Sequence, residues 1–422
     1  MAALEAGSGL LDASDIRPWG DLSGRSYTRF AEGDVLFAKI TPCMENGKFA
    51  VARGLRNGLG VGSTEFHVIR CPQGLEAKYV FYLLLQQSTR KRARAVMSGA
   101  VGQLRVPADF LFELAIPVPP AAEQMRIVAE IEKQLTRLDT AVAALEGARA
   151  NVKLYRASLL KAAIDGHLVP HRQSEFRTSL GELAVLITSG SRGWAEYYAD
   201  KGPFFIRAQD INTDSLRLDS AARVRLPERA EGIRTRVAPG DLLVTITGAN
   251  VAKTALVAWG IGEAYVSQHI ALIRLKDPAN AKFIYYWLVS PAHGRRALEA
   301  QAYGAGKPGL NLTQLRDLII ALPARLDQDS LIAALERRTS ILEALEAAVD
   351  NALVRADRLR QSVLMRAFEG RLVSQDRKDE PASALLQRIR AERLGSPSVL
   401  RARRRRTRQG RLQLPLVEVV SS

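Results

Sequence analysis

The sequence predicts an α+β protein with two globular domains, two long antiparallel coiled-coil helices that separate them, and an internal pseudo-twofold repeat. Three observations predict this fold: four motifs occur twice in the same order, each copy contains strand-like runs, and a long heptad pattern follows each set of runs. With 422 residues, the chain is too long for one hydrophobic core. No apolar run reaches the roughly 18–20 residues of a membrane-spanning helix, so we expect a soluble, cytoplasmic protein.

Four matched segments carry the internal repeat. They pair 30–36 (FAEGDVL) with 237–243 (VAPGDLL), 78–84 (KYVFYLL) with 282–288 (KFIYYWL), 114–117 (LAIP) with 320–323 (IALP), and 159–169 (LLKAAIDGHLV) with 363–373 (VLMRAFEGRLV). The offset stays between 204 and 207 residues. A period this long indicates a duplicated domain, because solenoid repeats are only about 20–50 residues long.

Each copy ends in an expected helix of about 40 residues, roughly 60 Å long. The first begins after the prolines of segment 117–120 and stops at Gly166. We predict a helix–helix seam formed by Val128, Ile131, Leu135, Leu138, Val142 and Leu145 on the first helix and by Leu335, Leu342, Leu345, Val349 and Leu359 on the second. Two helices longer than a small domain is wide are expected to pack on each other, and the return of the chain makes the pair antiparallel.

These patterns divide the chain into five parts. We expect globular domains at 1–120 and 169–325, helices at 121–168 and 326–370, and a basic tail at 371–422. The arginine-rich run 401–408 is typical of a solvated end. Because its positive charge attracts polyanions such as DNA, removing 401–422 is expected to weaken non-specific DNA binding and to leave target choice intact. The first copy has only 32 residues before Gly33 and no counterpart of the strand and turn that open the second copy. We therefore expect a truncated N-terminus and an unpaired strand edge in the first domain.

The composition favours nucleic acid as a partner and argues against several other classes. The formal net charge is +16, from 60 Lys and Arg against 44 Asp and Glu. Two cysteines and five scattered histidines provide neither a disulfide framework nor metal-ligand spacing. We expect no metal, no cofactor and no membrane partner.

Motifs for catalysis are missing from the sequence. A flipped adenine requires an Asn/Asp-Pro-Pro-Tyr/Phe motif, and none occurs. The nearest approach to a phosphate-binding loop, 248–254 (GANVAKT), lacks the second glycine and is one residue short. The sequence therefore favours a non-catalytic binding module.

Three segments closely resemble specificity subunits of type I restriction–modification systems: 33–48 (GDVLFAKITPCMENGK), 117–124 (PVPPAAEQ) and 159–169. The likeness covers about residues 1–394, although the second helix entry, 323–328 (PARLDQ), has lost most of its prolines. The resemblance implies two target-recognition domains that each bind one half of an interrupted sequence in double-stranded DNA, with the helices setting the gap. It also implies two adenine methyltransferase (modification) subunits and motor–nuclease (restriction) subunits as partners.

Polar residues in turns beside the expected strands are the candidates for DNA contact, because Arg, Lys, Asn and Gln recognise base edges and phosphates bind cations, hydroxyls and backbone amides. In the first domain they are Lys39, Thr41, Asn46, Lys48 and Arg53. In the second they are Arg192, Arg207, Gln209, Thr247, Asn250, Lys253 and Lys307. The basic segment 90–94 is a candidate phosphate clamp. A solvated surface role is the alternative for each of these residues.

Two other classes of protein remain open from the sequence. One is a scaffold whose helices pair and whose basic charge aids solubility. The other is a single chain that combines recognition, modification and restriction, against which the missing motifs argue. A neighbouring gene for a methyltransferase and another for a helicase would separate the recognition subunit from both.

Overall fold

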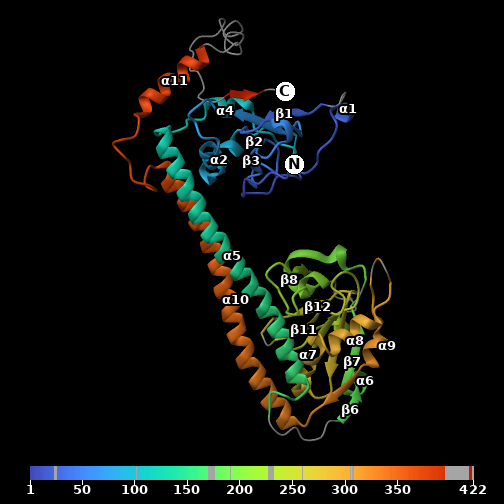
Figure 1. Ribbon diagram of the computed structural model, residues 1–422. Coiled ribbons are helices and arrows are strands. Elements are labelled where there is room, and N and C mark those ends of the chain that lie inside the picture. The colour runs from blue at the N-terminus through green and yellow to red at the C-terminus, as the bar shows by residue number, and fades with distance from the viewer. Residues whose placement is uncertain are drawn as a thin grey trace. The chain divides into compact units, whose positions relative to one another are not determined.

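In the computed structural model, the chain forms two compact units (Figure 1). Unit 1 contains Met1–Leu145 and Asn351–Ser422, and unit 2 contains Glu146–Asp350. Two helices of 44 residues each, α5 (Ala121–Ile164) and α10 (Arg325–Phe368), contribute to both units. The structure describes residues 1–22, 26–100, 102–169, 176–190, 192–226, 232–258, 260–304, 306, 308–394 and 418–420.

Unit 1 is built around a four-stranded antiparallel sheet with the order β3-β2-β5-β15. Its strands are β1 (Thr28–Ala31), β2 (Val35–Ala38), β3 (Phe49–Val51), β4 (Leu59–Gly62), β5 (Phe66–Arg70) and β15 (Glu418–Val420). Its shorter helices are α1 (Trp19–Leu22), α2 (Ala77–Leu85), α3 (Gln87–Ala95), α4 (Ala108–Glu113) and α11 (Ala382–Leu394), and η1 (Arg56–Gly58) is a 3-10 turn. Every residue of β2 is buried, which explains its continuous apolar run. Helix α2 packs against β2 and β3 and closes the core.

Unit 2 repeats this plan and adds strands. Its strands are β6 (Phe176–Ser179), β7 (Ala184–Ser189), β8 (Tyr198–Ile206), β9 (Ala222–Val224), β10 (Leu242–Thr245), β11 (Thr254–Leu256), β12 (Ala264–Val266), β13 (Ile270–Leu275) and β14 (Ile319–Leu322). Its shorter helices are α6 (Leu180–Leu183), α7 (Ala281–Val289), α8 (Gly294–Gln301) and α9 (Leu312–Arg316), with 3-10 turns η2 (Trp194–Tyr197), η3 (Ala208–Ile211), η4 (Ile233–Thr235) and η5 (Pro278–Asn280). The main sheet has the order β11-β10-β13-β7, beside the smaller sheets β12-β8-β9 and β14-β6.

Strand β15 takes in unit 1 the position that β7 has in unit 2. β15 pairs antiparallel with β5, with Val419 opposite Ile69, and β7 pairs antiparallel with β13, with Ile187 opposite Ile273. Ile69 and Ile273 are equivalent in the repeat. The expected unpaired edge in the first domain is therefore wrong, because a strand from the C-terminal segment covers it (Figure 1). Within the expected basic tail, the run 401–408 lies outside the described residues.

A buried glutamine fixes the start of each long helix. The side-chain amide of Gln124 donates to the Pro119 carbonyl at 2.9 Å, and that of Gln328 donates to the Pro323 carbonyl at the same distance. Both glutamines are almost fully buried. The second copy therefore keeps the proline and the glutamine, five residues apart, that make this contact.

Ion pairs between the short and long helices also repeat. Lys78 of α2 pairs with Glu132 of α5, and Lys282 of α7 pairs with Glu336 of α10 at 2.8 Å. In each unit one short helix is thus fastened to one long helix by residues at equivalent positions. These contacts and the matched sheets confirm the α+β class and the internal repeat.

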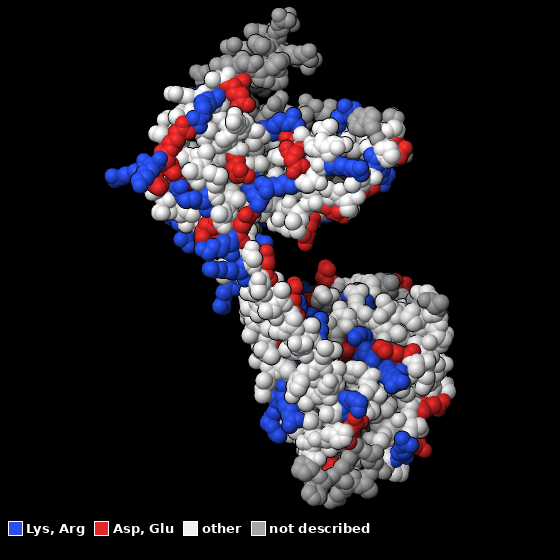
Figure 2. Space-filling view, in the orientation of Figure 1, with Lys and Arg blue, Asp and Glu red and all other residues white. Residues whose placement is uncertain are grey.

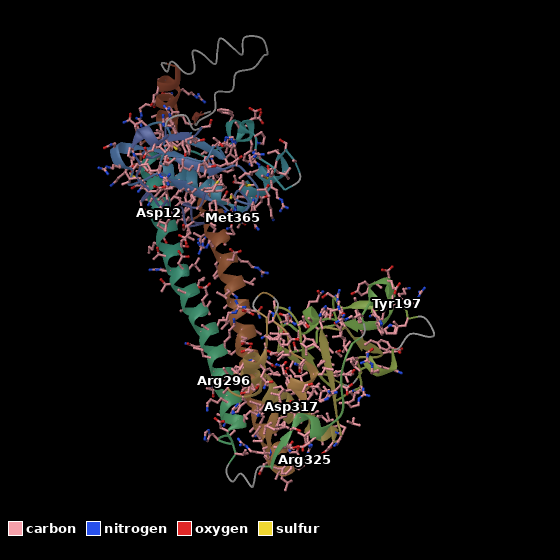
Figure 3. The ribbon with its side chains drawn as sticks, turned by 90° about the vertical axis from the view of Figure 1, so that its right-hand side faces the viewer. Asp12, Tyr197, Arg296, Asp317, Arg325 and Met365 are labelled. Atoms are coloured by element: carbon pink, nitrogen blue, oxygen red, sulfur yellow. The ribbon has the colours of Figure 1, made fainter. Side chains whose placement is uncertain are left out.

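The long helices lie side by side in the views of Figures 1 and 3, and they are antiparallel. In unit 2, Arg149 pairs with Asp350 at 3.4 Å and Arg156 with Glu346 at 3.1 Å. From the first pair to the second, the residue number rises from 149 to 156 on α5 and falls from 350 to 346 on α10. The two helices therefore run in opposite directions. All six α5 residues of the predicted seam are buried or half-buried, as are Leu335, Leu342 and Val349 of α10.

Two α10 residues of the predicted seam lie outside it. Leu345 and Leu359 are 46% and 49% exposed. Between Leu335 and Val363, the buried residues of α10 recur every seven positions, at Leu335, Leu342, Val349, Ala356 and Val363. A half-buried residue follows four positions later, as at Glu346 and Arg360. Because Glu346 and Arg360 form ion pairs with α5, their side chains cover the seam there and leave Leu345 and Leu359 on the open flank.

The described helices can be compared with the expectation that no segment spans a membrane. Among them, none combines the length and the apolar character that crossing a bilayer requires.

Candidate nucleic-acid interface

Each unit carries one polar turn between two strands of its main sheet. The polar turn of unit 1 is the segment 39–48 between β2 and β3, and the polar turn of unit 2 is the segment 246–253 between β10 and β11. The strands that carry them are buried, so each turn leaves a rigid sheet. Such turns expose polar groups at a fixed place, as recognition sites require.

A second segment braces each polar turn through equivalent backbone hydrogen bonds. In unit 1, the Thr41 amide donates to the Leu104 carbonyl at 3.0 Å, and the Thr41 hydroxyl reaches the same oxygen at 3.3 Å. In unit 2, the Gly248 amide donates to the Pro308 carbonyl at 2.9 Å. Leu104 and Pro308 are equivalent in the repeat. Both turns are therefore held before any ligand arrives.

The structure places four of the five candidates of unit 1 on the polar turn. Lys39, Thr41 and Lys48 are half-buried there, Asn46 is exposed, and Arg53 is exposed just beyond β3. The Lys48 ammonium lies 3.4 Å from the Met1 carbonyl oxygen, and the Arg53 guanidinium lies 3.7 Å from a Glu76 carboxylate oxygen. Asn46 is thus the most open candidate on this turn.

Unit 2 brings two groups of candidates together. Thr247, Asn250 and Lys253 are half-buried on the polar turn, Arg207 and Gln209 follow β8, Arg192 is exposed after β7, and Lys307 lies outside the described residues. The Asn250 amide donates to the Ala208 carbonyl at 3.1 Å, so the segment 207–209 lies beside the turn. The Lys253 ammonium lies 3.3 Å from an Asp214 carboxylate oxygen and is already paired. Gln209 remains exposed next to this contact.

The candidate phosphate clamp at 90–94 has two parts with different surroundings. Arg90 of α3 points inward: its guanidinium donates to the Glu45 carbonyl at 2.6 Å and to the Leu85 carbonyl at 3.2 Å. Burial lowers the pKa of Arg90. Lys91, Arg92 and Arg94 are exposed on the same helix. Arg90 therefore supports the polar turn of unit 1, and only its basic neighbours are open to a phosphate.

Two titratable residues lie below the polar turn of unit 1. The Arg105 guanidinium donates to both carboxylate oxygens of Glu65, at 2.7–3.1 Å, and lowers the pKa of Glu65. His67 is within 2.8 Å of the Val106 carbonyl, and burial lowers the pKa of His67. A neutral imidazole and a paired carboxylate thus stabilise the base of the turn.

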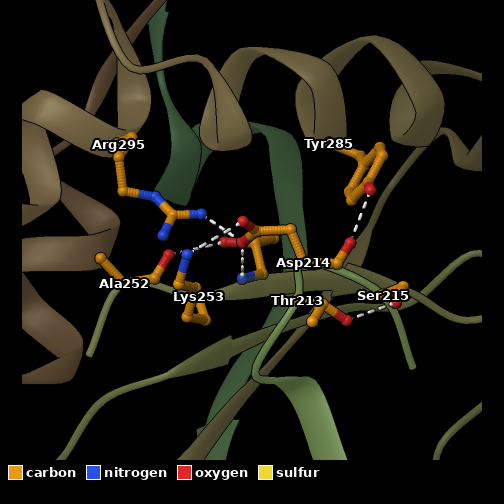
Figure 4. A network of polar contacts seen from close by, with 8 residues as sticks. Thr213, Asp214, Ser215, Ala252, Lys253, Tyr285 and Arg295 are labelled. Atoms are coloured by element: carbon orange, nitrogen blue, oxygen red, sulfur yellow. Dashed lines mark hydrogen bonds and ion pairs between the residues drawn. The ribbon is translucent and has the colours of Figure 1, made fainter. Parts of the chain in front are cut away.

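The polar contacts that position the turn of unit 2 were not predicted. Lys253, Tyr285 and Arg295 contact Asp214 from three different segments (Figure 4). Asp214 and Arg295 are 81 residues apart, so no local spacing points to their contact. The one local signal is the polar tetrapeptide 212–215, which is typical of a turn.

In unit 2, His293 lies between an aspartate and a serine and contacts both. His293 lies 2.9 Å from Asp165 and 2.9 Å from the Ser290 hydroxyl. Ser290 is fully buried, so no substrate reaches its oxygen. The three residues fasten the end of α5 to the start of α8, which is a structural role.

Metal-binding side chains and surface charge were the remaining features of a possible site. There, His, Cys, Asp and Glu form no group of three or more that is able to hold a metal ion. On the faces displayed in Figure 2, Lys and Arg side chains alternate with acidic and uncharged surface. The visible surface therefore shows no single broad basic field.

Comparisons with known proteins bear directly on these surfaces. The model of the type I restriction modification DNA specificity domain matches residues 234–353, which include the polar turn of unit 2. The type I restriction enzyme EcoEI specificity subunit of Escherichia coli is 40% identical over 126 residues, 30% of this chain and 21% of that protein. The chain thus spans about a fifth of that relative.

Other relatives extend the likeness over most of the chain. The type I restriction enzyme StySPI specificity subunit of Salmonella potsdam is 24% identical over 384 residues, 84% of this chain and 82% of that protein. A chain in a solved structure of the type I R-M system has the same fold, with a TM-score of 0.70 and 20% identity over 88% of this chain and 90% of that one. The resemblance predicted from the sequence motifs is confirmed.

Proposed function

From the relationship of this chain to type I specificity subunits, we propose that it is the DNA-recognition subunit of a type I restriction–modification complex. The domains at 1–120 and 169–325 each bind one half of an interrupted target in double-stranded DNA, and the helices at 121–168 and 326–370 set the gap. Partner subunits carry out adenine methylation and restriction, and this chain is not an enzyme. The role implies a cytoplasmic protein.

One observation carries the proposal: the same braced polar turn occurs in both units. Asn46 in unit 1 and Gln209 in unit 2 are exposed on or beside these turns, and amide side chains pair with two edge atoms of adenine in the major groove. The other candidates make further contacts to nearby bases and phosphates: Lys39, Thr41, Lys48, Arg53, Arg192, Arg207, Thr247 and Asn250. Two equivalent turns on one chain fit a target with two halves.

The proposal is tested by expressing the chain with its methyltransferase partners and mapping methyladenine across a host genome. We expect an interrupted motif with one methyladenine in each half. Asn46→Ala changes recognition in one half and Gln209→Ala in the other, each by about 1–3 kcal/mol of base discrimination. A continuous motif, or two substitutions that alter the same half, contradicts the proposal.

A second test concerns catalysis. The purified chain alone is expected to transfer no methyl group, hydrolyse no ATP and cleave no DNA. After the partner subunits are added, the complex is expected to show all three activities. If the isolated chain shows one of these activities, and a single substitution in the chain abolishes it, then catalysis resides in this chain and the proposal is wrong.

The helix pair offers a docking surface for the methyltransferase partner. In unit 2, Tyr155 and Leu345 precede the paired residues Arg156 and Glu346, so they lie at the same level of the antiparallel pair. Both are exposed, and Ile341 lies exposed one turn away. Exposed apolar side chains of this size on a charged helix are typical of a protein interface.

The opposite flank of the pair is already occupied. Glu336 of α10 is paired with Lys282 of α7, so the globular part of unit 2 covers that side. The flank with Tyr155 and Leu345 therefore remains for a partner. Leu345→Asp is expected to abolish binding of the methyltransferase subunit in size-exclusion chromatography, whereas Leu326→Asp, at another exposed apolar residue of α10, leaves it intact. Equal loss with both variants contradicts this interface.

A further inference from the structure

Asp214 joins four segments of unit 2 around the polar turn (Figure 4). Its carboxylate accepts from the Thr254 amide at 3.0 Å, lies 3.3 Å from the Lys253 ammonium, and pairs with the Arg295 guanidinium. Its backbone carbonyl accepts from the Tyr285 hydroxyl at 2.6 Å. One residue thus holds the end of the polar turn, β11, α7 and α8.

The backbone of Asp214 is adapted to this position. Its φ is 58°, in the left-handed region that Asn and Asp tolerate better than other non-glycine residues. This conformation turns the chain so that the carboxylate and the carbonyl of one residue face different partners. The surrounding contacts therefore maintain an otherwise uncommon conformation.

The buried arginine keeps the Asp214 carboxylate in place. The Arg295 side chain is only 8% exposed, and its Nε has no hydrogen-bond partner. If Asp214 moved out toward a ligand, the buried guanidinium would lose its anion, which is strongly unfavourable. The carboxylate is thus fixed, and it holds the Lys253 ammonium with it.

We propose that Asp214 is a specificity-determining residue of unit 2 that acts by withholding Lys253 from the DNA backbone while it fixes the end of the polar turn. This inference rests on the proposed function. A free lysine beside a recognition surface binds phosphate without regard to sequence and strengthens binding to every DNA equally. Pairing that lysine within the protein keeps this sequence-independent contribution small. The turn that Asp214 fixes holds in one geometry the base contacts that carry the discrimination.

Unit 1 supports its turn through a direct contact. Arg90 of α3 donates directly to the Glu45 carbonyl of the polar turn. In unit 2, Arg295 of α8 instead reaches the turn through Asp214. The pairing of Lys253 with a carboxylate lies in unit 2, so its effect is expected in the half-site that unit 2 recognises.

The experiment measures how the affinity of the full chain for a duplex without the target depends on salt. Asp214→Asn keeps the side-chain shape and the tolerated backbone conformation but releases Lys253. We expect the slope of log K against log salt to steepen by about 0.9, the value for one added phosphate contact. The double variant Asp214→Asn/Lys253→Met returns the slope to the wild-type value. Asp219→Asn, an equal change of charge at an exposed residue of the same loop, leaves it unchanged.

The single variant Lys253→Met tests the inference even if Asp214→Asn fails to fold, because it leaves the pair of Asp214 and Arg295 intact. We expect its slope to equal that of the wild type. A slope shallower by about 0.9 means that Lys253 contacts phosphate in the wild type, and the inference is then wrong. The inference is equally wrong if folded Asp214→Asn behaves like Asp219→Asn.

Target preference separates this inference from the proposed function. With methyltransferase partners present, Asp214→Asn is expected to lower discrimination in the half-site of unit 2 and to leave the other half unchanged. A wild-type chain with no preference for any sequence overturns the proposed function. A wild-type chain with clear preference, together with an unchanged Asp214→Asn variant, overturns only the role of Asp214.

Discussion

The Asp241 carboxylate accepts two hydrogen bonds from the Arg274 guanidinium, at 2.8 and 2.7 Å, from the neighbouring strand. The same carboxylate accepts from the Ala238 amide at 2.7 Å. In unit 1, Asp34 and Arg70 form the equivalent pair at 2.8 and 2.6 Å. The duplicated Gly-Asp motif thus has a physical cause: the aspartate closes the turn before the central strand and neutralises an arginine across it.

Breaking this pair is expected to destabilise one unit at a time. Arg274→Met leaves the buried Asp241 carboxylate without its cation and costs about 3 kcal/mol, the lower end for a broken buried pair because Arg274 is partly exposed. Arg70→Met has the same effect in unit 1. Hydrogen exchange of amides in β10 and in β2 reports the two units separately. The control Arg225→Met, at an exposed residue, changes stability by less than about 0.5 kcal/mol.

A charge in the buried seam and a charge on its flank are expected to differ in their effects. Val349→Asp buries an unpaired carboxylate between the helices and costs at least about 2 kcal/mol in urea unfolding. Leu345→Asp, four residues earlier, places its charge in solvent and costs less than about 1 kcal/mol. If both variants lower the free energy of unfolding equally, Leu345 lies in the buried seam and its assignment to the flank is wrong.

The heptad pattern predicted the long helices and three buried residues of α10, Leu335, Leu342 and Val349, but it placed Leu345 and Leu359 in the seam wrongly. Leucines occur both three and four residues apart on α10, so the apolar spacing allows two frames. The frame is decided by Glu346 and Arg360, whose partners lie on α5. Contacts between residues so distant in sequence leave no local periodicity to detect.

The polar turns were predictable and their supports were not. Gly, Asn and Lys between strand-like runs marked both turns in the sequence. Whether a given lysine faces solvent or a carboxylate depends on a residue elsewhere in the chain, as Lys253 and Asp214 illustrate. Likewise, β15 becomes part of the main sheet of unit 1 only through long-range pairing with β5.

The stability of unit 1 is expected to fall as the pH falls below about 6.5. Burial lowers the pKa of His67 in the folded chain, so the unfolded chain binds a proton in a range where the folded chain does not. The contribution of His67 to the free energy of unfolding is therefore fully present when the pH is above 6.5, the ordinary pKa of histidine. It decreases as the pH falls below that value. Urea unfolding of the wild type and of His67→Gln, compared at pH 7.5 and 5.5, measures the difference.

The Gln side chain keeps a donor for the Val106 carbonyl but does not titrate, so His67→Gln is expected to lose less stability than the wild type over this interval. The pKa of Glu65 is lowered from 4.5, so its contribution changes only at lower pH. A wild type and a variant with the same pH dependence would show that His67 does not titrate as described.

The last prediction concerns strand β15. Deleting 418–422 removes the strand that pairs with β5 and exposes the β5 edge, at a cost on the order of 2–3 kcal/mol for the lost backbone hydrogen bonds. We expect lower protection of β5 amides, more aggregation, and loss of the half-site that unit 1 recognises, while unit 2 keeps its own.

The matched control retains the strand and removes only charge. Replacing the arginines between positions 401 and 408 with Gln is expected to make non-specific DNA binding less dependent on salt and to leave both half-sites intact. The sequence predicted only a role in non-specific binding for 401–422, whereas the pairing of β15 with β5 predicts that the end of this segment also supports one half-site. The two variants separate these roles. If deletion of 418–422 leaves the protection of β5 and both half-sites unchanged, β15 contributes nothing to unit 1, and the tail acts through its charge alone.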